Sequence, residues 1–293
     1  MYVVRILSRC DNVTALGTNA QGQFAFVNAN YPFNPNSYWY LDQAFAIDGT
    51  PLGVSLRHVN TGSCLVAQPG AGPGNTLSFH PVDSFDGWST WTLGNVGGEA
   101  FALRPFNNGD LNLNRLGGCG GWVAGLWGWG GGQPNEVWRV IPVSGVPVPP
   151  RRRYRIDSGC ADFKGNHFSL SLGADGPVTV GGSVADSIWN VELFWKPDGS
   201  LQPGVGILNE ANGQSLNYVR GNSRVGLTSA SSFNNYNLWT FGGGGPYVAV
   251  RPVVESSQNL NVEGGCAGTI QPVCTWQWSG GQANEIWKFI RLP

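Results

Sequence analysis

The chain carries a long internal duplication. Residues 111–138 read Leu-Asn-Leu-Asn, then a Trp-Gly-Trp pair in a Gly-rich stretch, then Gln-Pro-Asn-Glu-Val-Trp. Residues 259–287 repeat this order as Asn-Leu-Asn, Trp-Gln-Trp, Ser-Gly-Gly and Gln-Ala-Asn-Glu-Ile-Trp. A shared pattern of this length is not produced by chance, so the sequence predicts two related halves.

A shorter repeat divides each half into three. A Trp that is followed two residues later by an apolar residue recurs about every 50 residues, and corresponding Trp residues of the two halves lie about 150 residues apart. We expect these six rings in the core: Trp39, Trp91, Trp138, Trp189, Trp239 and Trp287. The chain is therefore predicted to contain three repeats, a linker and three more repeats.

The local patterns favour strands. Residues 101–105, 110–114 and 137–141 alternate between apolar and polar side chains, and no segment keeps helical spacing over three turns. The 44 Gly and 13 Trp residues also fit an all-β protein, because Gly supplies turns and aromatic rings fill pleated surfaces. Three repeats are fewer than the about four blades that a propeller needs. We predict two tandem β-trefoil domains, each with three pseudo-threefold repeats, and keep one six-bladed ring as the alternative.

The domain boundary is predicted at a Pro-rich and Arg-rich segment. Residues 145–153 lack periodicity, and their Pro residues favour an extended form. The prediction places the first β-trefoil at residues 1–144, the linker at 145–153 and the second β-trefoil at 154–293. Blades of one ring would be joined by shorter connections, so this linker disfavours the six-bladed ring.

Charge and hydropathy exclude several functions. Charged residues make up 12% of the chain and the net charge is −1, so no basic face is expected that would neutralise the phosphates of a nucleic acid. No run of about 18 apolar residues is present, so membrane insertion is not expected. Residues 1–9 read as a first strand and lack the apolar core of a signal peptide.

The Cys residues allow two interpretations. Cys10 and Cys160 occupy matching places, as do Cys119 and Cys266. A chain of this length does not need a disulfide framework, so we slightly favour unpaired structural thiols over bridges. A local bridge between Cys266 and Cys274 is the further alternative.

No catalytic residue, metal site or cofactor is predicted. The His residues lie far apart, and the sequence has no His-x-x-x-His, Cys-x-x-Cys or Gly-x-Ser-x-Gly motif. Glu136 and Glu285 belong to different halves, so they are not expected to form a hydrolytic pair. We expect each Glu to orient the Asn that precedes it.

The apolar-x-Trp ending of each repeat resembles the Gln-x-Trp repeat of R-type (ricin B-like) lectins. The resemblance covers the whole chain as two tandem domains, and it implies β-trefoils that bind glycans without catalysis. This chain departs from the pattern because no repeat keeps the Gln; Glu136 and Glu285 stand there in the third repeats, and Ser or Asn in the others. The resemblance implies glycans or glycoconjugates on cell surfaces as partners, with galactose or GalNAc-type sugars favoured.

The third repeat of each half has the residue types that a neutral sugar requires. A Trp ring covers an apolar face of C–H groups, and Asn amides donate to and accept from neighbouring hydroxyls. In R-type lectins an early acidic residue, a later aromatic residue and the Asn before the final repeat motif contact the sugar. By position this implies eight ligand-binding residues: Asn114, Trp127, Trp129, Asn135, Asn261, Trp276, Trp278 and Asn284.

For several of these residues a structural role is an alternative to ligand binding. Asn114 and Asn261 replace the family's acid, which removes a charge-assisted hydrogen bond, and a turn-capping role is as well supported for them. One Trp of each pair is expected to pack inward while the other faces the ligand. Asn217 marks a weaker third site, because no Trp pair follows it.

Two other functions stay open. A protein-binding β-trefoil such as a protease inhibitor would act through one exposed loop, which fits a duplicated aromatic and polar stretch less well than a repeated ligand does. A glycan-targeting subunit of a toxin or hydrolase would have a partner chain that carries the activity. An extracellular location is favoured, with cytoplasmic storage as the alternative because no signal peptide is evident.

Overall fold

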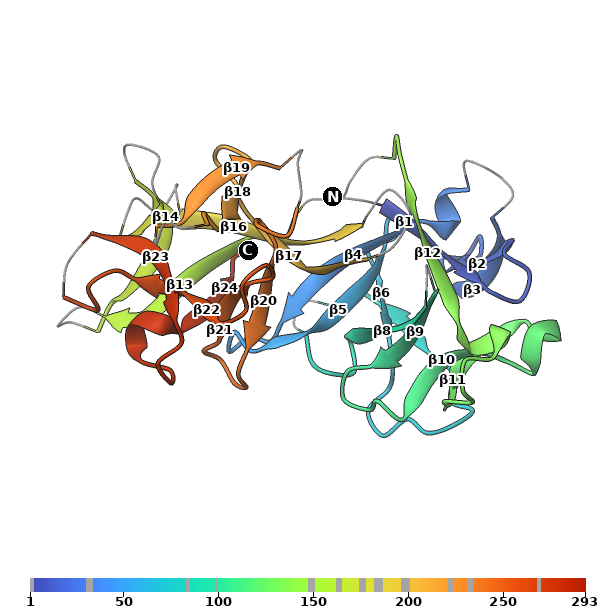
Figure 1. Ribbon diagram of the computed structural model, residues 1–293. Helices are drawn as coiled ribbons and strands as arrows, with labels where there is room; N and C mark the ends of the chain where they lie inside the picture. Colours follow the sequence, from blue (N-terminus) through green and yellow to red (C-terminus); the bar gives the residue numbers. More distant parts are fainter. Residues whose placement is uncertain are drawn as a thin grey trace. The chain divides into compact units, whose positions relative to one another are not determined.

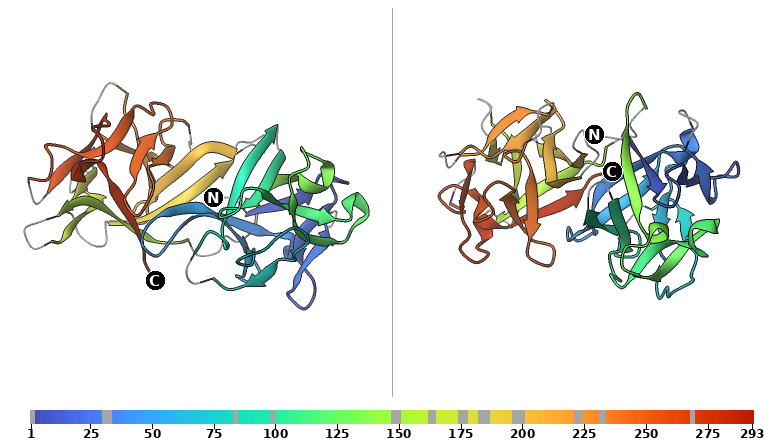
Figure 2. Two further views of the ribbon diagram at one scale, coloured as in Figure 1. Left: turned by 90° about the horizontal axis from the view of Figure 1, so that it is seen from below. Right: turned by 45° about the vertical axis from the view of Figure 1, so that its right-hand side comes forward.

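The computed structural model describes residues 3–29, 34–82, 85–97, 100–146, 151–161, 165–173, 178–181, 187–195, 201–220, 224–230, 234–267 and 270–293. Within these ranges the chain forms β-strands joined by turns, and no α-helix is present (Figure 1, Figure 2). Short 3-10 helices occupy Pro35–Ser37, Gly118–Gly120, Pro134–Glu136 and Ala283–Glu285. The described residues contain no helix that is long and apolar enough to cross a membrane.

The chain divides into two compact units. Unit 1 contains Met1–Ala44, Leu52–Pro150 and Trp195–Leu201. Unit 2 contains Phe45–Pro51, Arg151–Phe194 and Gln202–Pro293. Residues 147–150 of the predicted 145–153 linker lie outside the described residues.

The strands of unit 1 fall into three repeats of four. Repeat 1 has β1 (Val3–Ser8), β2 (Thr14–Thr18), β3 (Phe24–Asn28) and β4 (Trp39–Phe45). Repeat 2 has β5 (Pro51–His58), β6 (Cys64–Val66), β7 (Ser78–His80) and β8 (Trp91–Gly97). Repeat 3 has β9 (Ala100–Pro105), β10 (Leu111–Leu116), β11 (Val123–Gly128) and β12 (Trp138–Val143). In each repeat the first strand pairs with the fourth, and the second and third strands form a hairpin.

The strands of unit 2 also fall into three repeats of four. Repeat 4 has β13 (Tyr154–Ala161), β14 (His167–Leu172), β15 (Val178–Val180) and β16 (Ile188–Trp195). Repeat 5 has β17 (Leu201–Asn209), β18 (Gln214–Asn217), β19 (Gly226–Ser229) and β20 (Trp239–Gly242). Repeat 6 has β21 (Ala249–Pro252), β22 (Gln258–Val262), β23 (Gln271–Gln277) and β24 (Trp287–Arg291). The first strand of each unit pairs with its last, β1 with β12 and β13 with β24, so each unit closes on itself.

One hydrogen bond recurs in all six repeats. The repeat Trp, at or next to the start of the fourth strand, is fully buried, and its indole Nε1 donates to a Leu carbonyl in the second strand over 2.8–3.0 Å. The six pairs are Trp39–Leu16, Trp91–Leu65, Trp138–Leu113, Trp189–Leu170, Trp239–Leu216 and Trp287–Leu260. Buried indole N–H groups need an acceptor, and the same acceptor is available in every repeat. The predicted all-β class with two tandem β-trefoils is confirmed, and the six-bladed ring is wrong.

The prediction of unpaired thiols is wrong for four of the Cys residues. Cys10 is bonded to Cys119, and Cys160 is bonded to Cys266. Cys266 therefore does not pair with Cys274. Closure of each β-trefoil brings its first and third repeats together, a proximity that spacing along the chain does not reveal. The two remaining Cys side chains are buried and belong to neither disulfide: Cys64 and Cys274.

Candidate functional site

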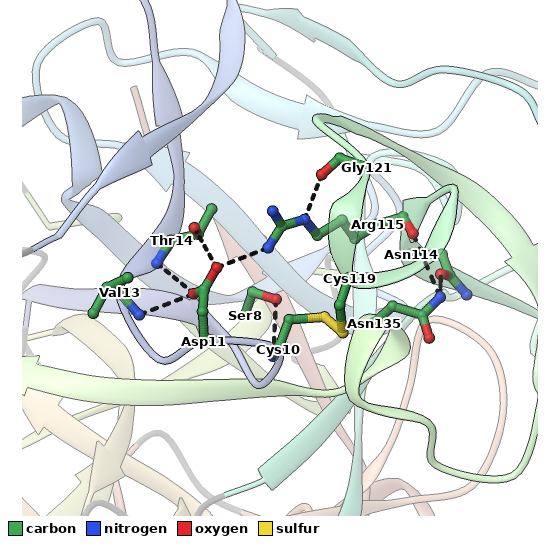
Figure 3. The surroundings of a disulfide bond; sticks show 10 residues. All are labelled: Ser8, Cys10, Asp11, Val13, Thr14, Asn114, Arg115, Cys119, Gly121 and Asn135. Atoms are coloured by element: carbon green, nitrogen blue, oxygen red, sulfur yellow. Dashed lines mark hydrogen bonds and ion pairs between the residues drawn. A yellow bond between two sulfur atoms is a disulfide. The ribbon is translucent and has the colours of Figure 1, made fainter.

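Two Asn side chains meet in the third repeat of each unit. Asn135, in the 3-10 turn before β12, donates from Nδ2 to Oδ1 of Asn114 on β10 over 2.6 Å (Figure 3). Asn284 donates in the same way to Asn261 on β22 over 2.5 Å. Asn114 and Asn261 are buried within strands rather than at turns, so they do not cap turns. Each pair leaves one carbonyl oxygen and one NH2 group for hydroxyls of a ligand.

The Glu after each of these Asn residues orders a Gly-rich loop. Glu136 is buried, and its carboxylate accepts hydrogen bonds from the backbone N–H groups of Gly130, Gly132 and Gln133 over 2.7–2.8 Å. Glu285 accepts from three equivalent N–H groups, those of Ser279, Gly281 and Gln282. The two Glu residues thus fix the backbone turn that carries the Asn rather than bonding to the Asn side chain.

A second pair of Asn residues supports the same turn. Asn112 is fully buried, and its Nδ2 donates to the carbonyl oxygens of Leu113 and Glu136, both over 2.9 Å. Asn259 makes the same two contacts in unit 2, to Leu260 and Glu285. This role was not predicted from the sequence, although the first Asn of Asn-Leu-Asn is repeated in both halves. These residues join the strand and the turn that carry the two amides.

The paired Trp rings have different surroundings. Trp127 on β11 is 53% exposed, and Trp276 on β23 is 60% exposed. Trp129 and Trp278 are half-buried. The guanidinium of Arg104 lies 4.9 Å from the centre of the Trp129 ring, and that of Arg251 lies 5.3 Å from the Trp278 ring. In each pair one ring is therefore available to a ligand, and the other is held by an Arg.

A cavity of about 310 Å³ gathers the predicted residues of unit 2. Asn261, Trp276 and Asn284 line it, together with Glu285, whereas Trp278 does not. Its volume lies within the range of about 300–1,000 Å³ that small-ligand sites occupy. Cys274 also lines the cavity, and burial, reinforced by the nearby Glu263 carboxylate, raises the pKa of this thiol to about 11.

The predicted weaker site has a different neighbourhood. Asn217 is half-buried at the end of β18, in the position that corresponds to Asn114 and Asn261. Tyr236 stands three residues before the repeat Trp, where the other sites have their second Asn. Its ring stacks on that of Tyr218 with the ring centres 6.3 Å apart. Repeat 5 therefore offers aromatic rings beside Asn217 but no amide pair.

The described residues contain no group of three or more His, Cys, Asp or Glu side chains arranged to hold a metal ion. His58 is buried against Trp39 and Phe79, with ring centres 5.4 and 5.7 Å away. Burial lowers the pKa of His58, which favours the neutral ring. This His belongs to the core of unit 1 rather than to a site.

No protein-family model matches this chain, and no curated protein matches it. Solved structures do: a mosquitocidal holotoxin is 12% identical, with a TM-score of 0.40 over 99% of this chain and 34% of its own. A Macrolepiota procera ricin B-like lectin in complex with lactose is 18% identical, with a TM-score of 0.38 over 47% of this chain and 94% of its own. The agglutinin from Abrus precatorius is 16% identical, with a TM-score of 0.37 over 98% of this chain and 96% of its own. This chain thus spans about a third of the length of the holotoxin chain.

Proposed function

We propose that this protein is a lectin that binds glycans and catalyses no reaction. The observation that carries the proposal is the unit 2 cavity, where Asn261, Trp276 and Asn284 line one space. The exposed Trp276 ring offers a flat surface for the C–H face of a sugar. The two amides offer a donor and an acceptor to neighbouring hydroxyls, at positions that the 2.5 Å amide–amide bond fixes.

The third repeat of unit 1 supplies a second site of the same design. Asn114 and Asn135 form the same amide pair, and Trp127 is the exposed ring. We assign Trp129 and Trp278 to the support of these sites, because each is stacked with an Arg. The resemblance to R-type lectins favours galactose or GalNAc-type sugars at both sites, and Asn217 in repeat 5 marks a weaker third site.

Two sites in one chain support binding to a surface that presents many glycans. A single shallow sugar site binds with a Kd of about 1 mM, or about −4 kcal/mol. Linking two such sites raises the effective affinity by about 100-fold or more when both can engage. We therefore propose cell-surface glycoconjugates as partners. The two disulfides support an extracellular location, because such bonds persist in oxidising compartments.

A glycan array and calorimetric titration of galactose with the whole chain test the proposal. Trp276→Ala and Asn284→Ala are each expected to remove binding at unit 2, and Asn135→Ala to remove binding at unit 1. Trp122→Ala is the matched control, because Trp122 is 71% exposed and lies outside both amide pairs. The proposal is wrong if wild type binds no glycan at high protein concentration.

A further inference from the structure

The two units differ in whether the hairpin of the first repeat pairs with the hairpin of the third repeat. In unit 2, β15 of repeat 4 pairs with β23 of repeat 6 through Thr179–Pro272 and Val180–Gln271. The corresponding strands of unit 1 are β3 and β11, and no pairing joins them in the described part of the chain. A cavity of about 510 Å³ occupies the space beside these strands of unit 1.

All three repeats of unit 1 contribute to this cavity, and each of them provides at least one aromatic ring to its lining. Repeat 1 provides Phe24 and Phe26, repeat 2 provides Phe79, and repeat 3 provides Trp122. The strand register explains why unit 2 differs. In each repeat, the Leu that accepts the Trp hydrogen bond pairs across its hairpin with one residue of the third strand. That residue is Phe26 in repeat 1 and Phe79 in repeat 2. The corresponding residue is Val180 in repeat 4 and Leu227 in repeat 5. Neither side chain has a ring that would keep the hairpins of neighbouring repeats apart.

The three Phe rings rest on the buried core. Phe26 is stacked on Trp138 with ring centres 6.2 Å apart. Phe24 and Phe79 each meet the ring of Trp39 edge-on, at 6.5 and 5.9 Å. Since Trp39 and Trp138 are fully buried and hydrogen bonded, the floor of the cavity is rigid before any ligand arrives.

The fourth ring, that of Trp122, is exposed to solvent and contacts the buried guanidinium of Arg115. Trp122 is 71% exposed, and the guanidinium of Arg115 lies 5.3 Å from its ring centre and 5.5 Å from that of Phe26. Arg115 is almost fully buried and forms an ion pair with Asp11 over 2.9 Å, beside the disulfide of Cys10 (Figure 3). An exposed ring that is fixed in this way loses little freedom when a ligand packs against it.

The lining also defines the charge of the ligand. No ionisable side chain is among the described residues that line the cavity, and Asp11 neutralises the Arg115 behind Trp122. A charged ligand would lose its hydration without a partner. Oε1 of Gln23 accepts a hydrogen bond from Asn19, so the NH2 group of Gln23 and the hydroxyl of Thr76 remain for one or two hydrogen bonds. We infer that this cavity binds an uncharged small molecule with an aromatic or fused-ring skeleton, separately from the proposed glycan sites.

Fluorescence titration of the whole chain tests this inference. The probe is N-phenylnaphthylamine, a neutral compound with a phenyl ring and a fused naphthalene ring system, and its counterpart is anilinonaphthalenesulfonate, which has the same skeleton with a negative charge. We expect one saturable site for the neutral probe and at least about tenfold weaker binding of the sulfonate, because nothing in the cavity compensates its charge. Added galactose should not displace the neutral probe.

Variants of exposed Trp residues provide the matched controls. Trp122→Ala is expected to lower the affinity for the neutral probe by about tenfold. Trp122→Phe is expected to retain most of that affinity because a ring remains. Trp127→Ala, which removes a similarly exposed ring from the proposed glycan site, should leave probe binding unchanged within about twofold. Near-ultraviolet circular dichroism checks that each variant is folded. Equal binding by wild type and Trp122→Ala, an effect of Trp127→Ala as large as that of Trp122→Ala, or displacement by galactose would overturn the inference.

Discussion

The Nδ2 atom of Asn135 lies 2.6 Å from the Oδ1 atom of Asn114. This bond directs the carbonyl oxygen of Asn114 toward Asn135, so at the proposed sugar site a ligand would meet the NH2 group of Asn114. The resemblance to R-type lectins places an acid at this position, where a second oxygen would accept from a sugar hydroxyl. The amide pair therefore presents a donor where the family pattern presents an acceptor.

Replacing this amide by a carboxylate should strengthen sugar binding. In Asn114→Asp one carboxylate oxygen still accepts from Asn135, and the other can accept from a hydroxyl as a charge-assisted bond. We expect the affinity for galactose to rise by about threefold to tenfold, which calorimetry at neutral pH would measure. Asn60→Asp is the control, because Asn60 is exposed and lies outside both amide pairs. Weaker binding by Asn114→Asp would show that the ligand uses the NH2 group instead.

Removal of the Glu136 carboxylate should loosen the loop and weaken the site together. Glu136→Ala leaves three backbone N–H groups without their acceptor, and we expect a loss of about 2–3 kcal/mol in the free energy of unfolding. Urea denaturation would measure this loss, and a sugar titration the accompanying fall in affinity. Glu255→Ala changes an exposed Glu and should alter neither quantity. Unchanged stability in Glu136→Ala would mean that solvent replaces the carboxylate at little cost.

The fold was predictable from the sequence because its core is repeated. Six Trp residues at regular spacing fix the number of repeats, and every one of them makes the same hydrogen bond to a Leu carbonyl. The Asn–Asn contacts could be anticipated only as a set of residues near one site. Nothing in the spacing shows that the side chain of Asn135 donates a hydrogen bond to that of Asn114.

Contacts between repeats were not predictable. The bond between Cys10 and Cys119 and the ion pair between Asp11 and Arg115 both join repeat 1 to repeat 3 across more than 100 residues. Each depends on how the hairpins meet after closure, which local periodicity does not encode. The stacking of Arg104 in β9 on Trp129, which follows β11, lies within repeat 3, but it too depends on how elements that are not adjacent in the sequence pack together.

Thiol counting should reveal the disulfides directly. The six Cys residues form two bonds and leave Cys64 and Cys274, so alkylation after unfolding without reductant should label two thiols. In the folded protein at pH 8, Cys274 should react slowly, because its pKa is raised to about 11 and the thiolate is the reactive form. Mass spectrometry of the labelled peptides would identify both sites. Labelling of four or six thiols would contradict the bonded pairs.

Protonation of the Asp11 carboxylate should make unit 1 less stable in acid. Burial acts to raise the pKa of Asp11, but hydrogen bonds from Thr14, Val13 and Arg115 outweigh it and lower the pKa to about 2 from 3.8. A lowered carboxyl pKa gives stability that is present above about pH 4 and is lost as the pH falls toward about 2. With a third of the Asp11 side chain exposed, we expect this contribution to be only about 1 kcal/mol.

Comparison of wild type with Asp11→Asn isolates this contribution, because other carboxyl groups titrate equally in both proteins. Hydrogen exchange of unit 1 peptides in urea would give the free energy of opening at several pH values. The difference between the two proteins should be about 1 kcal/mol at pH 6 and should shrink toward zero near pH 2. A difference that does not change with pH would show that the Asp11 hydrogen bonds, which an Asn can partly replace, matter rather than its charge.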